Sequence, residues 1–96
     1  METEMIAKGK QYVMGTYAQA PVVIESGEGV YLTDNTGKKY LDMVSGIAVN
    51  SLGYNHPAVV NAIKEQAEKL IHISNLYWNE PQIALAEKLC KTSGLG

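Results

Sequence analysis

The chain has 96 residues, enough for one small domain with a core and too few for two ordinary ones. Hydrophobic residues make up 46% of it and charged residues 19%, a balance typical of globular proteins and not of disordered or fibrous ones. The formal net charge is −2 and all eight basic residues are lysines, so the composition excludes a strong basic field for nucleic acid or an anionic membrane.

The N-terminus and the cysteine content indicate the cytoplasm. Met1 to Glu4 is polar and acidic and leads into no apolar stretch, so it lacks the pattern of a signal peptide. No window comes near the roughly 20 apolar residues that a membrane-spanning helix needs. Cys90 is the single cysteine and cannot form an intramolecular disulfide, which fits a reducing compartment. We therefore expect a cytoplasmic protein without a membrane segment.

The first part of the chain, about residues 1–56, predicts a helix followed by a small antiparallel meander. Apolar residues recur at an approximate helical spacing over 3–14. Turns are expected at 26–29 and at Asp34–Gly37, where glycine and asparagine favour a hairpin. The expected strands are short and partly alternating: 22–24, 30–33 and 38–41. Three such strands are marginal alone, so the sheet needs a helix or another chain to pack on.

The second part predicts two further helices. Residues 42–53 fit neither the helical nor the strand period. Pro57 suits the first turn of a connecting helix over 57–72, in which apolar side chains repeat every 3.6 residues. Residues 73–96 predict a loop and a last helix, which begins near Asn79 and ends before Gly94. The fold class is therefore α+β.

The residues that could carry chemistry form no self-sufficient active site. His56, His72 and Cys90 lack the spacing of a metal site, and we interpret them as a cap, a loop residue and a residue of an apolar helix face. Ser45 does not stand in a Gly-x-Ser-x-Gly elbow. The glycines of 27–29 are followed by a strand and not by the helix that a dinucleotide-binding motif requires.

Two carboxylates and one aromatic pair also favour structural roles. Asp34 and Asp42 flank the predicted hairpin, and we interpret each as a turn or cap residue instead of an acid–base pair. Tyr77 and Trp78 are adjacent aromatic residues in a loop, a feature enriched at interfaces and binding sites. Plain packing is favoured over ligand contact for this pair.

Several short motifs follow one another in an order and spacing that is specific as a set. They are Pro21-Val22-Val23-Ile24, Gly27-x-Gly29-Val30-Tyr31-Leu32-x-Asp34, Gly37-Lys38-Lys39-Tyr40-Leu41-Asp42, Ser45-Gly46-Ile47-Ala48-Val49-Asn50-x-Leu52-Gly53, His56-Pro57, Ala62-Ile63-x-x-Gln66 and His72-x-Ser74-Asn75-x-Tyr77-x-Asn79-Glu80-Pro81. Over about residues 10–92 this succession resembles the start of the class III aminotransferases, which depend on pyridoxal phosphate. The chain departs from the usual Gly-His-x-His-Pro of that family, because Tyr54 stands at the first histidine position.

The resemblance implies a fold and an activity. Within the class, Gly46–Asn50 and Ser74–Pro81 are most similar to the subfamily that acts on N-acetylornithine in arginine biosynthesis. The segment would form part of the small domain of a fold type I transferase: an N-terminal helix, a three-stranded antiparallel sheet and a long helix toward the cofactor domain. The whole homodimeric enzyme would use pyridoxal phosphate to move an amino group from its amino-acid substrate to a 2-oxo acid, 2-oxoglutarate.

The resemblance also implies which residues matter. Ile47 would face the substrate, whereas Asn75 and Tyr77 would lie near the active-site mouth and the dimer interface. The Schiff-base lysine would lie beyond Gly96, so this chain would hold no catalytic, cofactor-binding or metal-binding residue. We expect the chain alone to be an inactive fragment that does not bind the cofactor specifically.

Two alternatives stay open from the sequence. The chain could instead begin an aminotransferase that acts on ornithine or on 4-aminobutyrate. It could also be a non-catalytic module that self-associates through a stripe formed by Met5, Ile6 and Val13.

Overall fold

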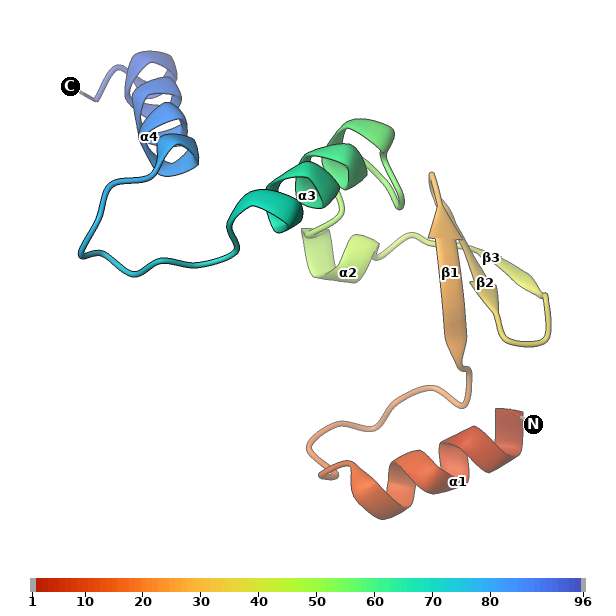
Figure 1. Cartoon of the computed structure of the whole chain (residues 1–96). Coiled ribbons are helices and arrows are strands. Elements are labelled where there is room, and N and C mark those ends of the chain that lie inside the picture. Colours follow the sequence, from red (N-terminus) through yellow and green to blue (C-terminus); the bar gives the residue numbers. More distant parts are fainter. Residues whose placement is uncertain (1, 96) are drawn as a thin grey trace. The chain divides into compact units, whose positions relative to one another are not determined.

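The structure is a computed structural model that describes residues 2–95, and it confirms the α+β class (Figure 1). By their internal contacts the residues form two units, Met1–Ala62 and Ile63–Gly96. The elements follow in chain order: α1 (Glu2–Tyr12), β1 (Ile24–Glu28), β2 (Tyr31–Asp34), β3 (Lys39–Leu41), α2 (Ser45–Ala48), α3 (Pro57–Lys69) and α4 (Glu80–Ser93). No helix within 2–95 is long and apolar enough to cross a membrane.

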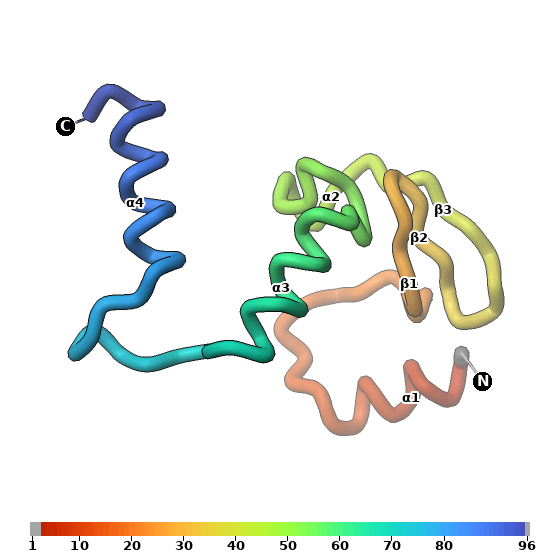
Figure 2. Tube along the Cα trace, turned by 45° about the horizontal axis from the view of Figure 1, so that its top comes forward, coloured from red at the N-terminus to blue at the C-terminus, as the bar shows by residue number. Residues whose placement is uncertain are grey.

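The three strands form an antiparallel meander in the order β1-β2-β3 (Figure 2). Leu32 in the middle strand pairs with Gly27 on one side and with Tyr40 on the other. The register of β1 shifts between Ile24 and Ser26, so Glu25 forms a bulge there. The predicted meander and its hairpin turn after Asp34 are confirmed.

The position predicted for the first strand, 22–24, is wrong. The strand runs over Ile24–Glu28, so the turn expected at 26–29 is instead a tight connection that contains Gly29. Gly29 has a φ of 58°, a conformation that glycine adopts without strain. Gly27 has a different role, because a Cβ at this position would lie 2.7 Å from Cγ of Tyr54. It is a glycine inside a strand because an aromatic ring lies against it.

Two backbone hydrogen bonds between Gly29 and Tyr54 close residues 29–54 into a loop within the first unit. The N–H of Gly29 donates to the carbonyl of Tyr54 at 3.0 Å, and the N–H of Tyr54 donates back at 2.8 Å. Gly53 lies so close that a Cβ would come within 2.7 Å of the Gly29 carbonyl oxygen, and its φ is 78°. We call this pair the Gly29–Tyr54 junction.

The helix α3 begins as predicted and ends earlier. Pro57 is its first residue, and Nδ1 of His56 accepts a hydrogen bond from the N–H of Ala58 at 3.2 Å, so the predicted cap role of His56 is confirmed. The helix ends at Lys69 and not at 72. The side-chain amide of Gln66 donates to the carbonyl of Leu70 at 2.9 Å, which satisfies a carbonyl group at that end.

The helix α4 has the predicted caps at both ends. The side-chain oxygen of Asn79 accepts from the N–H of Gln82 at 3.0 Å, and Pro81 follows in the first turn. At the other end Gly94 is left-handed, with a φ of 72°, and its N–H donates to the carbonyl of Cys90 at 3.1 Å.

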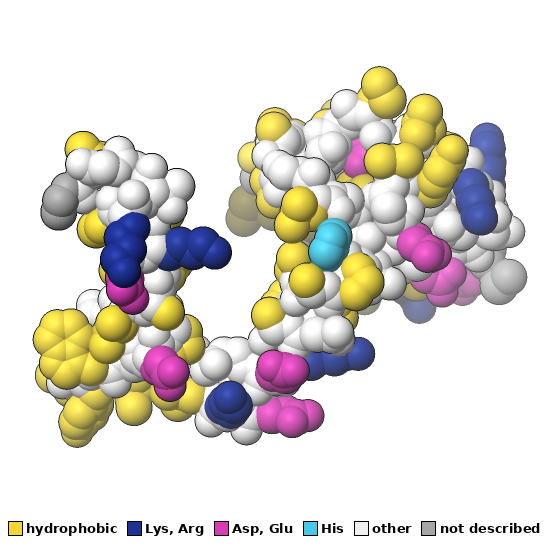
Figure 3. All heavy atoms as spheres, turned by 90° about the horizontal axis from the view of Figure 1, so that it is seen from above, with side chains coloured by type: hydrophobic (Ala, Val, Ile, Leu, Met, Phe, Trp, Pro, Cys, Tyr) yellow, Lys and Arg dark blue, Asp and Glu magenta, His cyan; other side chains and the backbone are white. Residues whose placement is uncertain are grey.

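Neither unit has an apolar core of its own. None of the hydrophobic side chains in the described part of the chain is buried, and Figure 3 shows many of them on the face in view. Cys90 lies in α4, as predicted, but its side chain is exposed and not packed, because none of the hydrophobic side chains in the described part of the chain is buried. Secondary structure here depends on hydrogen bonds and caps, and apolar faces of this extent require a covering surface.

The close approach of Gly53 to Gly29 predicts that a side chain at position 53 destabilises the protein. We expect Gly53→Ala to reduce the free energy of unfolding by about 2 kcal/mol or more, because a left-handed φ and a backbone clash combine there. Urea denaturation of the protein measures the loss. Gly15→Ala is the matched control, since a Cβ at that position meets no atom within 4 Å. Equal stability of the two variants would contradict the close approach at the junction.

Candidate functional site

Asp34 organises the hairpin between β2 and β3. One of its carboxylate oxygens accepts from the hydroxyl of Thr36 at 2.6 Å and from the N–H groups of Thr36 and Lys38, both at 2.9 Å. The other oxygen accepts from the hydroxyl of Tyr40 at 2.9 Å. With 2% of its surface exposed, Asp34 is the only buried residue among 3–95. These four bonds fix the turn, as its sequence position predicted, and leave no carboxylate oxygen without a donor.

The same bonds change the acidity of Asp34. The hydroxyl of Thr36 is the main cause that lowers the pKa of this carboxyl group to about 2, and burial opposes the shift. The hydroxyl of Tyr40 and the N–H groups of Lys38 and Thr36 lower the pKa further. Asp34 is therefore a firmly ionised structural carboxylate and not a proton donor.

Asp42, the second predicted turn or cap residue, connects the end of the sheet to the next segment. Its carboxylate accepts from the N–H of Val44 at 2.9 Å, from the N–H of Ser45 at 3.1 Å and from the hydroxyl of Tyr54. The Tyr54 hydroxyl is the main cause that holds the pKa of Asp42 below its usual value, and Asp42 in turn raises the pKa of Tyr54. The pair thus favours a carboxylate that accepts from a protonated phenol.

The segment after Asp42 is α2, which is a short left-handed turn. Ser45, Gly46, Ile47 and Ala48 have φ angles of 58°, 64°, 64° and 61°. Ser45, Ile47 and Ala48 carry a Cβ, so each of these three residues is strained by about 1–2 kcal/mol relative to the right-handed conformation. Such strain persists only where surrounding contacts fix the backbone, and it concentrates at functional sites. We call residues 45–48 the left-handed turn.

The left-handed turn exposes Ile47, the predicted substrate-facing residue. Its side chain is 85% exposed. The carbonyl of Ser45 accepts from the N–H groups of Val49 and Asn50 at 2.8 and 2.9 Å, which closes the turn on its C-terminal side. No sequence pattern of residues 42–53 predicted this conformation, because a run of left-handed residues has no hydrophobic period that a sequence would show.

The other two predicted site residues lie in the second unit. Asn75 lines a depression of about 300 Å³ together with Leu70 and Pro81. Tyr77 lies outside that lining and is 64% exposed. The N–H of Leu76 donates to the hydroxyl oxygen of Ser74 at 3.3 Å, so a local turn shapes this loop. Ile47 belongs to the first unit, and its grouping with Asn75 and Tyr77 at one mouth stays a prediction.

The apolar stripe of the predicted self-associating module lies along a groove of the first unit. Met5, Ile6 and Val13 line this groove, which has a volume of about 520 Å³ and continues along the chain to Val23. Its lining is largely apolar and suits a covering surface of protein.

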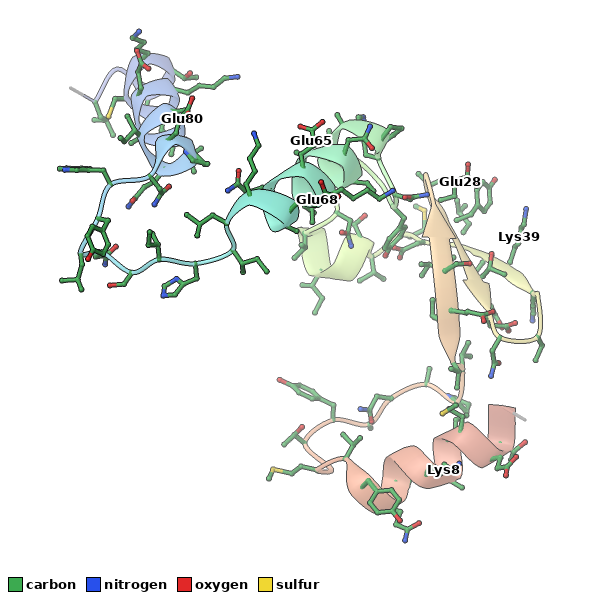
Figure 4. All side chains as sticks on the ribbon, in the orientation of Figure 1. Lys8, Glu28, Lys39, Glu65, Glu68 and Glu80 are labelled. Carbon is green, nitrogen blue, oxygen red and sulfur yellow. The ribbon has the colours of Figure 1, made fainter. Side chains whose placement is uncertain are left out.

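The described residues do not fit a covalently attached aldehyde cofactor. A lysine that forms a Schiff base needs a desolvated or charge-tuned position to be a nucleophile near neutral pH. All eight lysines are exposed; Lys39 on β3, for example, extends away from the sheet (Figure 4). Among the side chains of residues 3–95 there is also no group of three or more His, Cys, Asp or Glu that could hold a metal ion.

Comparison with known proteins identifies the protein family that this chain matches. The family described as "Aminotransferase class-III" matches residues 12–95. A protein named acetylornithine aminotransferase from Caldanaerobacter subterraneus subsp. tengcongensis is 56% identical over 89 residues, 93% of this chain and 23% of the relative.

Solved structures agree with the family match. The crystal structure of acetylornithine aminotransferase from Elizabethkingia anophelis is 32% identical, with a TM-score of 0.96 over 99% of this chain and 25% of that chain. The ornithine aminotransferase of Toxoplasma gondii ME49 is also 32% identical, with a TM-score of 0.93 over 98% of this chain and 22% of that chain. The chain thus spans about a quarter of the length of the proteins that it matches.

The low pKa of Asp34 predicts that the stability of the hairpin depends on pH. Because its folded-state pKa is about 2, below the usual 3.8, its ionisation stabilises the hairpin above about pH 4, and this contribution is lost as the pH falls through about 2. We expect Thr36→Val to raise the pKa of Asp34 toward its usual value, whereas Thr16→Val leaves it unchanged. A carboxyl-carbon NMR titration measures both. A pKa that Thr36→Val does not change would contradict the assignment of the hydroxyl as the main cause.

Proposed function

Since the chain belongs to the class-III aminotransferase family, we propose that it is the N-terminal segment of an enzyme that transfers the amino group of N-acetylornithine to 2-oxoglutarate. The observation that carries the proposal is the identity to proteins named acetylornithine aminotransferase over nearly the whole segment. The same assignment implies pyridoxal phosphate as cofactor, a role in arginine biosynthesis, a homodimer and a cytoplasmic location.

In this proposal the segment shapes the substrate entrance and does not hold the cofactor. Ile47 contacts the amino donor, and Asn75 and Tyr77 lie near the mouth or at the dimer interface. The exposed position of Ile47 on a strained turn supports its role, because no contact within its unit covers that side chain. Residues 57–72 connect the small domain to the cofactor domain. The cofactor-binding residues belong to the remaining three quarters of the enzyme.

An ornithine aminotransferase is the second candidate, supported by the similarity to the protein from T. gondii. The two donors differ at the α-nitrogen, which is a neutral amide in N-acetylornithine and an ammonium group in ornithine. Contact with the isoleucine side chain favours the neutral amide, because removing a charged ammonium group from water against an apolar surface costs free energy. Ile47 therefore favours the first candidate.

The proposed activity can be measured directly. We expect the full-length protein with pyridoxal phosphate to form glutamate from 2-oxoglutarate when N-acetylornithine is the donor. With ornithine we expect kcat/KM to be at least about tenfold lower, the factor that one unfavourable buried contact produces. Coupled glutamate detection measures both rates. A preference for ornithine or 4-aminobutyrate would replace this proposal by one of the alternatives.

The chain of 96 residues alone should lack specific cofactor attachment. After incubation with pyridoxal phosphate and borohydride reduction, we expect label spread over several of its exposed lysines, because none is set apart by burial. Peptide mass spectrometry locates the label, and the full-length protein serves as the control with one dominant site. A single dominant lysine in the short chain, or measurable transamination by it, would overturn this prediction.

A further inference from the structure

The left-handed turn cannot hold its conformation through its own side chains. Ile47 is almost fully exposed, and the flanking Val44 and Val49 are exposed as well. The direction of the Ile47 side chain is therefore set by the backbone alone. A strained backbone keeps one direction only when contacts outside the strained residues fix it.

Two contacts at the start of the turn provide this fixation. The carboxylate of Asp42 accepts from the N–H groups of Val44 and Ser45, the residues where the chain enters the turn. The hydroxyl of Tyr54 donates to Oδ2 of the same carboxylate, the oxygen that also accepts from the N–H of Ser45. Hydrogen bonds to a charged acceptor are the stronger kind, so Asp42 restrains the entry of the turn.

Tyr54 is itself held by the sheet. Its ring lies against Gly27 in β1, and its backbone pairs with Gly29 on both its N–H and its carbonyl. The sheet, Tyr54, Asp42 and the left-handed turn thus form one continuous series of contacts within the first unit. A change at the Tyr54 hydroxyl alters the turn while the sheet and the ring contact stay in place.

We propose that Asp42 and Tyr54 are positioning residues that hold the left-handed turn so that Ile47 meets the amino donor at the group in which the two donors differ and selects the neutral amide over the charged ammonium group. This inference rests on the proposed function. Neither residue touches the reacting atoms in this proposal; both act through the direction of Ile47. Their removal should change the choice between donors more than the ability to transaminate.

The test uses Tyr54→Phe in the full-length holoenzyme, because phenylalanine keeps the ring against Gly27 and removes only the hydroxyl. We expect the ratio of kcat/KM for N-acetylornithine to kcat/KM for ornithine to fall about tenfold, the effect of losing one hydrogen bond to a charged group. Hydrogen exchange in residues 43–50 should become faster in the same variant. Tyr17→Phe is the matched control, because it removes an exposed hydroxyl in the same unit.

Asp42→Asn is the second variant, and it covers the case in which Tyr54→Phe does not fold. An amide oxygen still accepts from the N–H groups of Val44 and Ser45 but loses the charge, so we expect a smaller fall in the same ratio. The ratio is the informative quantity, because general destabilisation lowers kcat/KM for both donors by the same factor.

The outcomes separate this inference from the function on which it rests. Faster exchange over 43–50 together with a lower donor ratio supports the proposal. Unchanged exchange, or a ratio equal to that of Tyr17→Phe while the wild type transaminates, overturns the positioning role alone. A wild-type enzyme that transaminates neither donor overturns the proposed function, and the assignment of Ile47 to a donor falls with it.

Discussion

The Gly29–Tyr54 junction is the constraint on which the first unit depends. Two backbone hydrogen bonds join the end of β1 to the residue before the loop that leads into α3. They bring the Tyr54 ring onto Gly27 and its hydroxyl onto Asp42. A side chain on any of the glycines at 27, 29 or 53 would strain or displace this arrangement. Three glycines are thus needed for contacts and for backbone angles, and not for flexibility.

The second constraint is the absence of a core. Hydrogen bonds, caps and turns form the helices and strands, but they contribute little net stability each because water competes for the same groups. Hydrophobic burial supplies most of the stability of a domain, and none of the described hydrophobic side chains is buried. A chain with this surface needs a covering surface to be stable, and it spans about a quarter of the length of the proteins that it matches.

The sequence predicted best those features that a few adjacent residues determine. The caps at His56–Pro57 and Asn79–Pro81 and the turn after Asp34 each follow from local hydrogen-bonding chemistry. The first strand was misplaced because glycine favours both turns and close contacts, and the contact at Gly27 is made by Tyr54, far away in the chain. In the sequence, Tyr54 is distinguished only as a departure from the family motif. The left-handed turn was missed because contacts outside it, at Asp42 and Asn50, stabilise it.

The junction has a consequence for the order in which the protein acquires structure. Its partners are 25 positions apart, and every other pairing of the sheet is more local still. Local pairings form quickly, since little chain entropy is lost in closing short loops. The pairings around Ile47 can therefore form before the apolar faces of the unit meet a covering surface. During that interval its uncovered apolar faces are the surfaces that a chaperone would bind.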